Sequence, residues 1–228
     1  MILHIPHSSA KFPNDTYIPN GVRQFTDWFT NKIFDKHFYM VYPYSRYHCD
    51  VERLESEQDE ILQTIDTDGT VYRTLSESDS DAILLEYKKW HTELKTNAEF
   101  QASYLDNVVV VDCHSFSASQ LNMSESDVPD ICIGYNDYNA LPQEVMAQVA
   151  RLYEINGYSV RFNFPYANAI VASKLPNVYS IMLEVNKRLY LDDSGNTPEL
   201  LYNWKRLRDV NRMVLRYLTQ FELGINEP

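Results

Sequence analysis

Four apolar runs in the sequence each end in polar groups that can bind metals or move protons. Valines 108–111 lead into Asp112, Cys113, His114 and Ser115, and residues 1–5 lead into His7. Residues 178–183 lead into Glu184. The remaining segment follows Tyr47 and carries Asp50, Glu52 and Arg53. In open α/β folds, ligands bind just beyond the carboxyl ends of buried strands. The four segments are therefore predicted to build one site.

Two imidazoles and one carboxylate from separate strand ends form a ligand set typical of catalytic zinc, whose fourth position is left for water. His7 and His114 are the candidate imidazole ligands. The preferred carboxylate is Asp50, with Glu52 as the alternative, because both lie on one short segment. Zinc lowers the pKa of water from about 16 to about 7. The sequence thus predicts one Zn²⁺ ion that generates a nucleophile at neutral pH.

Proton transfer and ligand orientation require further groups. Glu184 is the candidate general base that carries a proton to the leaving group. Asp112 lies two residues before His114, on the same side of the strand, and can orient a ligand imidazole by a hydrogen bond. His91 shares a helix face with Tyr87, so packing and a role beside the ligands carry equal weight. The other histidines, His4, His37 and His48, are expected to be structural or at the surface.

Arg53 has two interpretations: it pairs with an acid such as Glu55, or it offers its guanidinium fork to a substrate carboxylate. A hydrolase with a Ser/His/Asp arrangement, using Ser115 or Ser8, is the alternative use of these groups. We disfavour that mechanism because the sequence contains no GxSxG motif.

Composition narrows the function classes. The 228 residues suffice for a core without disulfides, and one domain spanning 1–228 is expected. A net charge of −12 without a Lys/Arg cluster argues against nucleic acid and anionic membranes as partners. The three cysteines form no CxxC pair, and no apolar stretch approaches the roughly 20 residues of a membrane span. A cytoplasmic protein is expected.

Helical and strand patterns alternate along the chain. Helices are predicted over 25–38, from Asp81 onward, after Pro142 with Gly157 as terminator, and from Thr197 onward. Strands are predicted at 1–5, 40–42, 108–111, 131–134, 158–162 and 178–183, and a long polar excursion at 56–81. This alternation indicates a three-layer α/β/α sandwich with a mixed, mostly parallel sheet.

The polar segments also resemble the motifs of the N-formylglutamate amidohydrolase family, in the family's order. These motifs are Pro6-His7-Ser8, Asp50-Val51-Glu52-Arg53, Asp112-Cys113-His114-Ser115-Phe116 and Glu184-Val185-Asn186-Lys187-Arg188. The resemblance runs from the first strand to Tyr190. It implies a fold related to zinc exopeptidases and hydrolysis of the formyl amide of N-formylglutamate in amino-acid catabolism.

By this resemblance, His7 and His114 hold zinc with an acidic third ligand, and Glu184 is the counterpart of the carboxypeptidase general base. A small anionic N-acyl amino acid is the expected substrate, bound by Arg53 together with Arg188, Asn186, Ser115 and Tyr166. The chain departs from the family at Ser9 and at Ala167-Asn168-Ala169, where the family often has glycine. Loss of glycine restricts the backbone of a loop that faces the substrate.

Overall fold

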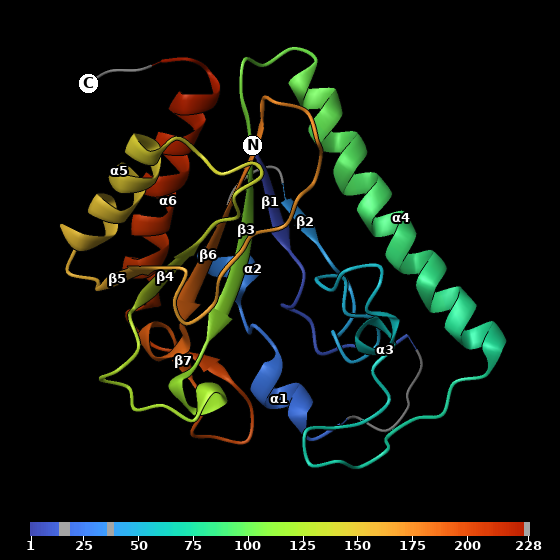
Figure 1. Ribbon diagram of the computed structural model, residues 1–228. Helices are drawn as coiled ribbons and strands as arrows, with labels where there is room; N and C mark the ends of the chain where they lie inside the picture. Colours follow the sequence, from blue (N-terminus) through green and yellow to red (C-terminus); the bar gives the residue numbers. More distant parts are fainter. Residues whose placement is uncertain (14–18, 36–38, 226–228) are drawn as a thin grey trace.

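The computed structural model describes residues 1–13, 19–35 and 39–225. Within these ranges six strands form the main sheet, in the order β2-β1-β3-β6-β4-β5 (Figure 1). The strands are β1 (Ile2–Ile5), β2 (Tyr39–Val41), β3 (Val108–Phe116), β4 (Ile131–Gly134), β5 (Val160–Phe162) and β6 (Val178–Asn186). Neighbouring strands pair in parallel, except for β4 and β6, which pair antiparallel. The predicted mixed, mostly parallel sheet is confirmed.

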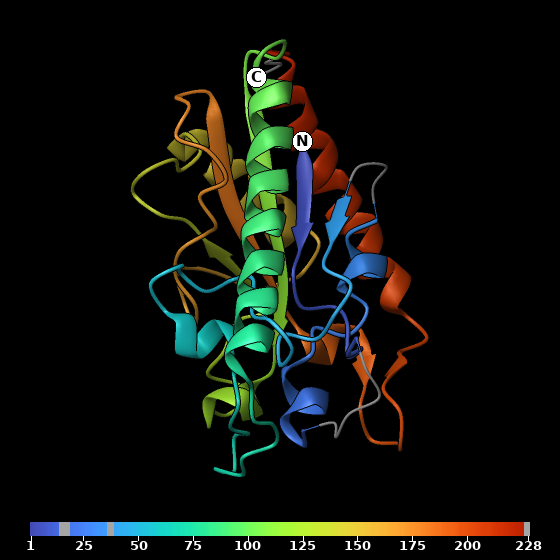
Figure 2. The ribbon, with the colours of Figure 1, turned by 90° about the vertical axis from the view of Figure 1, so that its right-hand side faces the viewer.

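Helices cover both faces of this sheet. The long helix α4 (Glu77–Ala102) lies on one face, and α5 (Gln143–Glu154) and α6 (Trp204–Glu222) lie on the other (Figures 1 and 2). On β3, Val108 and Val110 pack in the cluster of α4, whereas Val109 and Val111 pack in the cluster of α5 and α6. Burial on both faces explains the unbroken run of valines. The predicted three-layer sandwich is confirmed.

The alternation of side chains along β3 decides where its polar end points. Asp112 and His114 share the face of Val108 and Val110, which is the α4 face. In the register of the sheet, His114 lies opposite Glu184 of β6. The parallel strands deliver both groups to one edge of the sheet, as the sequence predicted.

Local signals explain where the helices begin and end. α4 begins earlier than predicted, because Ser76 and Asp79 form a reciprocal capping box ahead of Asp81. Pro142 is the N-cap of α5, and Gly157 follows that helix with φ +89°, a conformation that favours glycine.

The predicted helix over 25–38 is wrong. The chain instead forms two short helices, α1 (Gly21–Phe25) and α2 (Thr30–Ile33). Thr26 is extended and Phe29 has a left-handed backbone, so no continuous helix passes between them. This break lets the buried Asp27 side chain lie next to His7 and His114. His37 lies outside the described residues.

The helix predicted from Thr197 also begins elsewhere. Residues Glu199–Leu200 form β8, which pairs antiparallel with β7 (Leu191–Asp192), and α6 begins only at Trp204. Within the excursion 56–81, the chain forms the short helix α3 (Gln58–Ile61). No helix in the described parts of the chain is both long and apolar enough to cross a bilayer.

Candidate metal and catalytic site

Three donor groups meet at the carboxyl edge of the sheet. Oδ2 of Asp27 lies 3.3 Å from Nδ1 of His114 and 3.8 Å from Nδ1 of His7. All three side chains are buried, and one donor atom from each lies within 4.8 Å of the others. Two imidazole nitrogens and one carboxylate oxygen match the donor set of catalytic zinc.

Three separate segments supply these donors. His7 follows β1, and His114 lies near the end of β3. Asp27 lies in the break between α1 and α2, where its backbone N–H donates to the carbonyl oxygen of His7 at 2.9 Å. The Asp27 carbonyl in turn accepts from the Thr30 hydroxyl at 2.9 Å. These bonds fix Asp27 against the strand end.

A second carboxylate contacts the far nitrogen of each imidazole. Asp50 lies 2.8 Å from Nε2 of His7, and Asp112 lies 2.9 Å from Nε2 of His114. When each Nε2 donates to its carboxylate, Nδ1 keeps a lone pair directed at Asp27. Such carboxylate–histidine pairs fix both the tautomer and the ring orientation of metal ligands. Asp112 holds this position relative to His114.

The structure places Asp50 differently from the expectation that it binds metal. Its carboxylate lies on the Nε2 side of His7 and accepts two bonds from Arg46, at 2.7 and 3.1 Å. Nε of Arg53 lies 3.3 Å from the same oxygen. Asp27 occupies the place expected for Asp50, and the sequence analysis assigned it no role.

The alternative ligand Glu52 belongs to a neighbouring cluster with His4 and Asp112. Nε1 of Trp90 donates to Nε2 of His4 at 3.0 Å, and Nδ1 of His4 lies 2.8 Å from Asp112. Because an indole only donates, Nε2 of a neutral His4 is the acceptor and its proton is on Nδ1, facing Asp112. In this form His4 has no lone pair for a metal, so we assign this cluster to orienting His114.

Burial and neighbouring charges shift the pKa values of the groups around the proposed metal position. Burial, helped by Arg46, lowers the pKa of His7 to about 4, so this ring is neutral at pH 7. Burial alone raises the pKa of Asp50, but Arg46 and His7 hold it well below its usual range. Burial lowers the pKa of His114, but Asp112 and Asp27 together raise it well above its ordinary value. Without a metal, Nδ1 of His114 therefore carries a proton as well, and a bound cation would displace it.

Glu184 lies in the wall of the same cavity, on the strand beside His114. Burial, together with Asp27 and Asp112, raises its pKa to about 8 against the opposing effect of His114. Within the described structure its Oε2 atom is buried without a hydrogen-bond partner. A carboxyl group with a pKa near the working pH and a free oxygen can carry a proton in either direction.

The cavity has a volume of about 610 Å³, which suits a small-molecule ligand. Arg46, Arg53 and the loop 166–171 line it. Asn136 and Asp112 hold this loop by bonds to backbone groups of Ala169 and Ile170, at 3.0 and 3.3 Å. The loop is therefore an ordered wall of the cavity.

Asn168 in this loop has φ +87°, so an asparagine occupies a backbone conformation that favours glycine. A Cβ atom on Gly134 would lie 2.4 Å from the backbone oxygen of Asn168. Only glycine at 134 permits so close an approach. The loop thus keeps a glycine-type backbone although its own sequence lacks glycine.

The structure brings some of the predicted substrate-binding residues to the cavity and not others. Ser115 and Tyr166 line it, and the Ser115 hydroxyl donates to Asp27 at 3.0 Å. Arg188 does not line it, because its guanidinium binds Glu125 and Asp130, each at 2.8 Å.

Asn186 does not line the cavity either. Its side-chain oxygen accepts a hydrogen bond from the backbone N–H of Arg188 at 3.1 Å. His91 lines the cavity and contacts the Val51 carbonyl oxygen at 2.9 Å. Lys187, which sequence reasoning missed, is buried with Nζ 3.9 Å from Asp27. Its position directly before Arg188 in the late motif is the signal that could have identified it.

The residues present fit a divalent metal. In the described structure, Nδ1 of His7 is buried without any hydrogen-bond partner, although it faces Asp27. An unpartnered buried polar atom is costly. A cation between the three donors would satisfy it and neutralise part of the surrounding acid.

Comparisons with known proteins agree with this description. A family model described as N-formylglutamate amidohydrolase matches residues 1–191. A crystal structure of N-formylglutamate amidohydrolase from Ralstonia eutropha JMP134 superposes with a TM-score of 0.83 at 15% identity, covering 97% of this chain and 93% of that one. The structure of gene product Atu2144 from Agrobacterium tumefaciens gives 0.69 at 18% identity, covering 97% and 91%. No curated protein matches the chain.

Proposed function

Since the chain belongs to the N-formylglutamate amidohydrolase family, we propose that it hydrolyses the amide of an N-acyl amino acid with the help of zinc. N-formyl-L-glutamate is the leading substrate, and formate and L-glutamate are the products. Other N-acyl amino acids or peptides are the alternative. The observation that supports this proposal best is the convergence of His7, Asp27 and His114, two of them oriented by further carboxylates.

His7, Asp27 and His114 would hold the metal, with Asp50 and Asp112 orienting the two imidazoles. When bound, a zinc ion polarises the acyl carbonyl and lowers the pKa of water. The ligand set includes Asp27 in place of Asp50 because Asp27 lies within reach of both Nδ1 atoms, whereas Asp50 contacts Nε2 of His7.

Hydrolysis joins a water oxygen to the acyl carbon and breaks the carbon–nitrogen bond. Glu184 takes a proton from the water and passes it to the departing nitrogen, which leaves as an amine. The oxygen of the water remains in the released acid. Glu184 returns to its starting protonation state because it has passed on the proton that it took. A pKa near 8 suits this exchange, since the group must both accept and donate.

Arg53 is the best placed group for a substrate carboxylate. It lines the cavity, and its side chain is 37% exposed. Its ion pairs to Asp50 and Glu60 are made through Nε. Its two terminal nitrogens make no hydrogen bond within the described structure. Arg46, in contrast, donates two bonds to Asp50 and is needed there. Arg53 therefore offers its guanidinium fork to the ligand.

The test is formate release from N-formyl-L-glutamate by the purified protein, with N-acetyl and longer N-acyl glutamates measured beside it. Metal content is determined on the same sample. We expect about one zinc per chain and turnover that is lost in Asp27→Asn and Glu184→Gln. His48→Gln, outside the cavity, serves as the control and should retain activity.

The outcomes separate the parts of the proposal. Release of a different acid from another N-acyl amino acid would keep the reaction class and replace the substrate. Stoichiometric zinc without any turnover would favour a ligand-binding protein that has lost catalysis. Full activity in metal-free protein would contradict the zinc dependence.

A further inference from the structure

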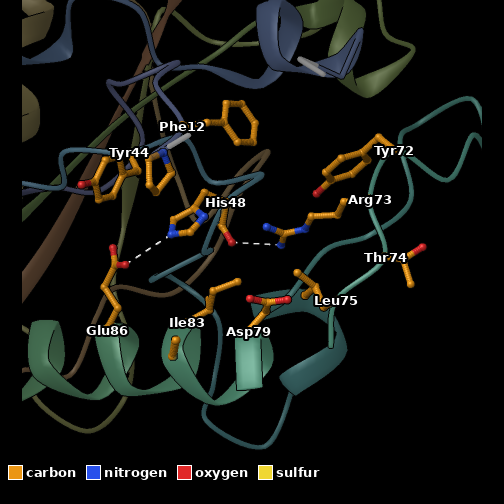
Figure 3. Close-up of a pocket in the computed structure, with 12 residues that line it drawn as sticks. Phe12, Tyr44, His48, Tyr72, Arg73, Thr74, Leu75, Asp79, Ile83 and Glu86 are labelled. Carbon is orange, nitrogen blue, oxygen red and sulfur yellow. Dashed lines mark hydrogen bonds and ion pairs between the residues drawn. The ribbon is translucent and has the colours of Figure 1, made fainter. Parts of the chain in front are cut away.

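A second cavity, of about 640 Å³, lies beside the first half of α4. Its walls come from α4, from residues 72–75 and from residues 44–48, and it shares no lining residue with the catalytic cavity. Figure 3 shows Glu86, Ile83 and Asp79 on α4 along one side, with Phe12 on the opposite side. The proposed reaction makes no use of this cavity.

Arg73 supplies the positive charge of the second cavity. Its Nε donates to the carbonyl oxygen of Gln63 at 2.7 Å. Its Nη2 donates to the carbonyl oxygen of His48 at 2.9 Å, as Figure 3 shows. Within the described ranges Arg73 makes no ion pair, in a chain whose net charge is −12. Two backbone carbonyls thus fix a guanidinium that no described acidic side chain neutralises and whose remaining N–H groups can bind a carboxylate.

Apolar and aromatic side chains form much of the wall. The Arg73 guanidinium lies over the ring of Tyr72, with its Cζ atom 5.5 Å from the ring centre. Tyr44 lies beside His48. Leu75 and the buried Ile83 complete this surface. A ligand that fills the cavity therefore needs an apolar or aromatic body in addition to its carboxylate.

Two acidic groups line the cavity as well, and they argue against a simple anion. Both oxygens of Glu86 are engaged, one by the Tyr42 hydroxyl and the other by His48 at 3.3 Å. Asp79 uses Oδ2 to cap α4 through Ser76, whereas Oδ1 makes no hydrogen bond within the described structure. A cationic group on the ligand would meet Asp79 and balance the repulsion that a lone carboxylate would experience.

We propose that this second cavity binds a free α-amino acid with an aromatic or large apolar side chain. Arg73 holds its carboxylate, Asp79 holds its ammonium group, and the side chain packs between Tyr44, Tyr72 and Ile83. The site is independent of metal binding and of hydrolysis at the other cavity.

Calorimetric titration with three probes tests the charge pattern. L-phenylalanine carries both charges, 3-phenylpropanoate lacks the ammonium group, and 2-phenylethylamine lacks the carboxylate. We expect L-phenylalanine to bind and each truncated probe to bind about tenfold more weakly or worse, since each probe lacks one charge-assisted hydrogen bond. Equal binding of all three, or no binding of L-phenylalanine up to its solubility limit, would overturn the proposal.

A filled cavity tests the location. Ala82 is exposed on α4 and lines the second cavity, so Ala82→Phe places a ring in it without removing any hydrogen bond. Thr96→Phe adds the same ring to an exposed position of the same helix, away from both cavities. We expect Ala82→Phe to abolish binding of L-phenylalanine and Thr96→Phe to leave it unchanged. Binding retained in Ala82→Phe, or lost equally in both variants, would assign the ligand elsewhere.

Discussion

Trp90 donates its indole N–H to Nε2 of His4 at 3.0 Å, which places the proton of a neutral His4 on the nitrogen that faces Asp112. Asp112 receives this bond at 2.8 Å and also contacts Nε2 of His114 at 2.9 Å. A chain of hydrogen bonds thus links a residue of α4 to a proposed metal ligand. Both His4 and Trp90 are outside the cavity wall.

This chain predicts that Trp90 supports metal binding from a distance. Trp90→Phe keeps an aromatic ring beside Tyr42 but removes the donor, so His4 can change tautomer and Asp112 loses a defined partner. We expect zinc affinity to fall about tenfold, at the lower end of the effect of changing such outer partners. Competition with a chromophoric chelator measures this affinity. Trp204→Phe, on α6, is the control, and an equal loss there would indicate a general effect of removing tryptophan.

Two arginines should separate substrate binding from loop support. Arg53→Ala removes the terminal nitrogens proposed to bind the substrate carboxylate. KM is expected to rise about ten- to a hundredfold, which corresponds to the loss of a charge-assisted hydrogen bond. Arg188→Ala breaks the ion pairs to Glu125 and Asp130 and should lower stability by at most about 1 kcal/mol. Its KM should change little. Steady-state kinetics and denaturant unfolding distinguish the two, and a large KM effect at Arg188 would contradict this assignment.

Asn168 should be sensitive to alanine and tolerant of glycine. Its φ of +87° suits glycine, and asparagine tolerates it better than alanine. Asn168→Ala is expected to destabilise the fold by about 1 kcal/mol, whereas Asn168→Gly should be close to neutral. The neighbouring Ala167→Gly is the matched control and should be mildly destabilising. Denaturant midpoints measure all three, and equal effects of alanine and glycine at 168 would contradict the backbone argument.

The three cysteines are expected to be inert in the native protein. Burial raises the pKa of Cys49 to about 12 and that of Cys132 to about 11, and it raises the pKa of Cys113 well above its ordinary value. At pH 8 a thiol with a pKa of 11 is about 0.1% thiolate, and the thiolate is the reactive form. A chromogenic disulfide reagent should react slowly with folded protein, faster as pH rises, and quickly once the chain unfolds. Rapid labelling of a folded thiol at pH 8 would contradict this expectation.

Much of the site could be predicted because strand ends are a local feature of the sequence. The valine run fixes β3, and its alternation places Asp112 and His114 on one face. His7 and Glu184 follow from the same reasoning at β1 and β6. These residues required only the rule that polar groups at the carboxyl ends of parallel strands share one edge.

Asp27 could not be found in this way. The spacing of Phe25, Trp28, Phe29 and Ile33 imitates a helix, whereas the chain breaks at Thr26 and Phe29 to present the carboxylate. The left-handed backbone of Phe29 is rare for an aromatic residue and gives no signal in the sequence. Only the tertiary contact with the His7 carbonyl oxygen reveals the role of this break.

The side-chain directions of Asp50 and Arg188 could not be predicted from the sequence either. Both stand in motifs beside functional residues, but the direction of their side chains depends on distant partners. Arg46 and the far nitrogen of His7 hold Asp50. Glu125 and Asp130 hold Arg188. Position along the chain therefore predicted proximity to the site, and tertiary contacts decided the role.

Anomalous X-ray diffraction at the zinc absorption edge, from crystals of zinc-loaded protein, tests the central claim most directly. We predict one anomalous peak about 2.0–2.2 Å from Nδ1 of His7, Nδ1 of His114 and a carboxylate oxygen of Asp27, the usual lengths of zinc bonds. A peak bound by Asp50, or one among His4, Glu52 and Asp112, would contradict the ligand set. Absence of any peak in zinc-loaded crystals would contradict the metal itself.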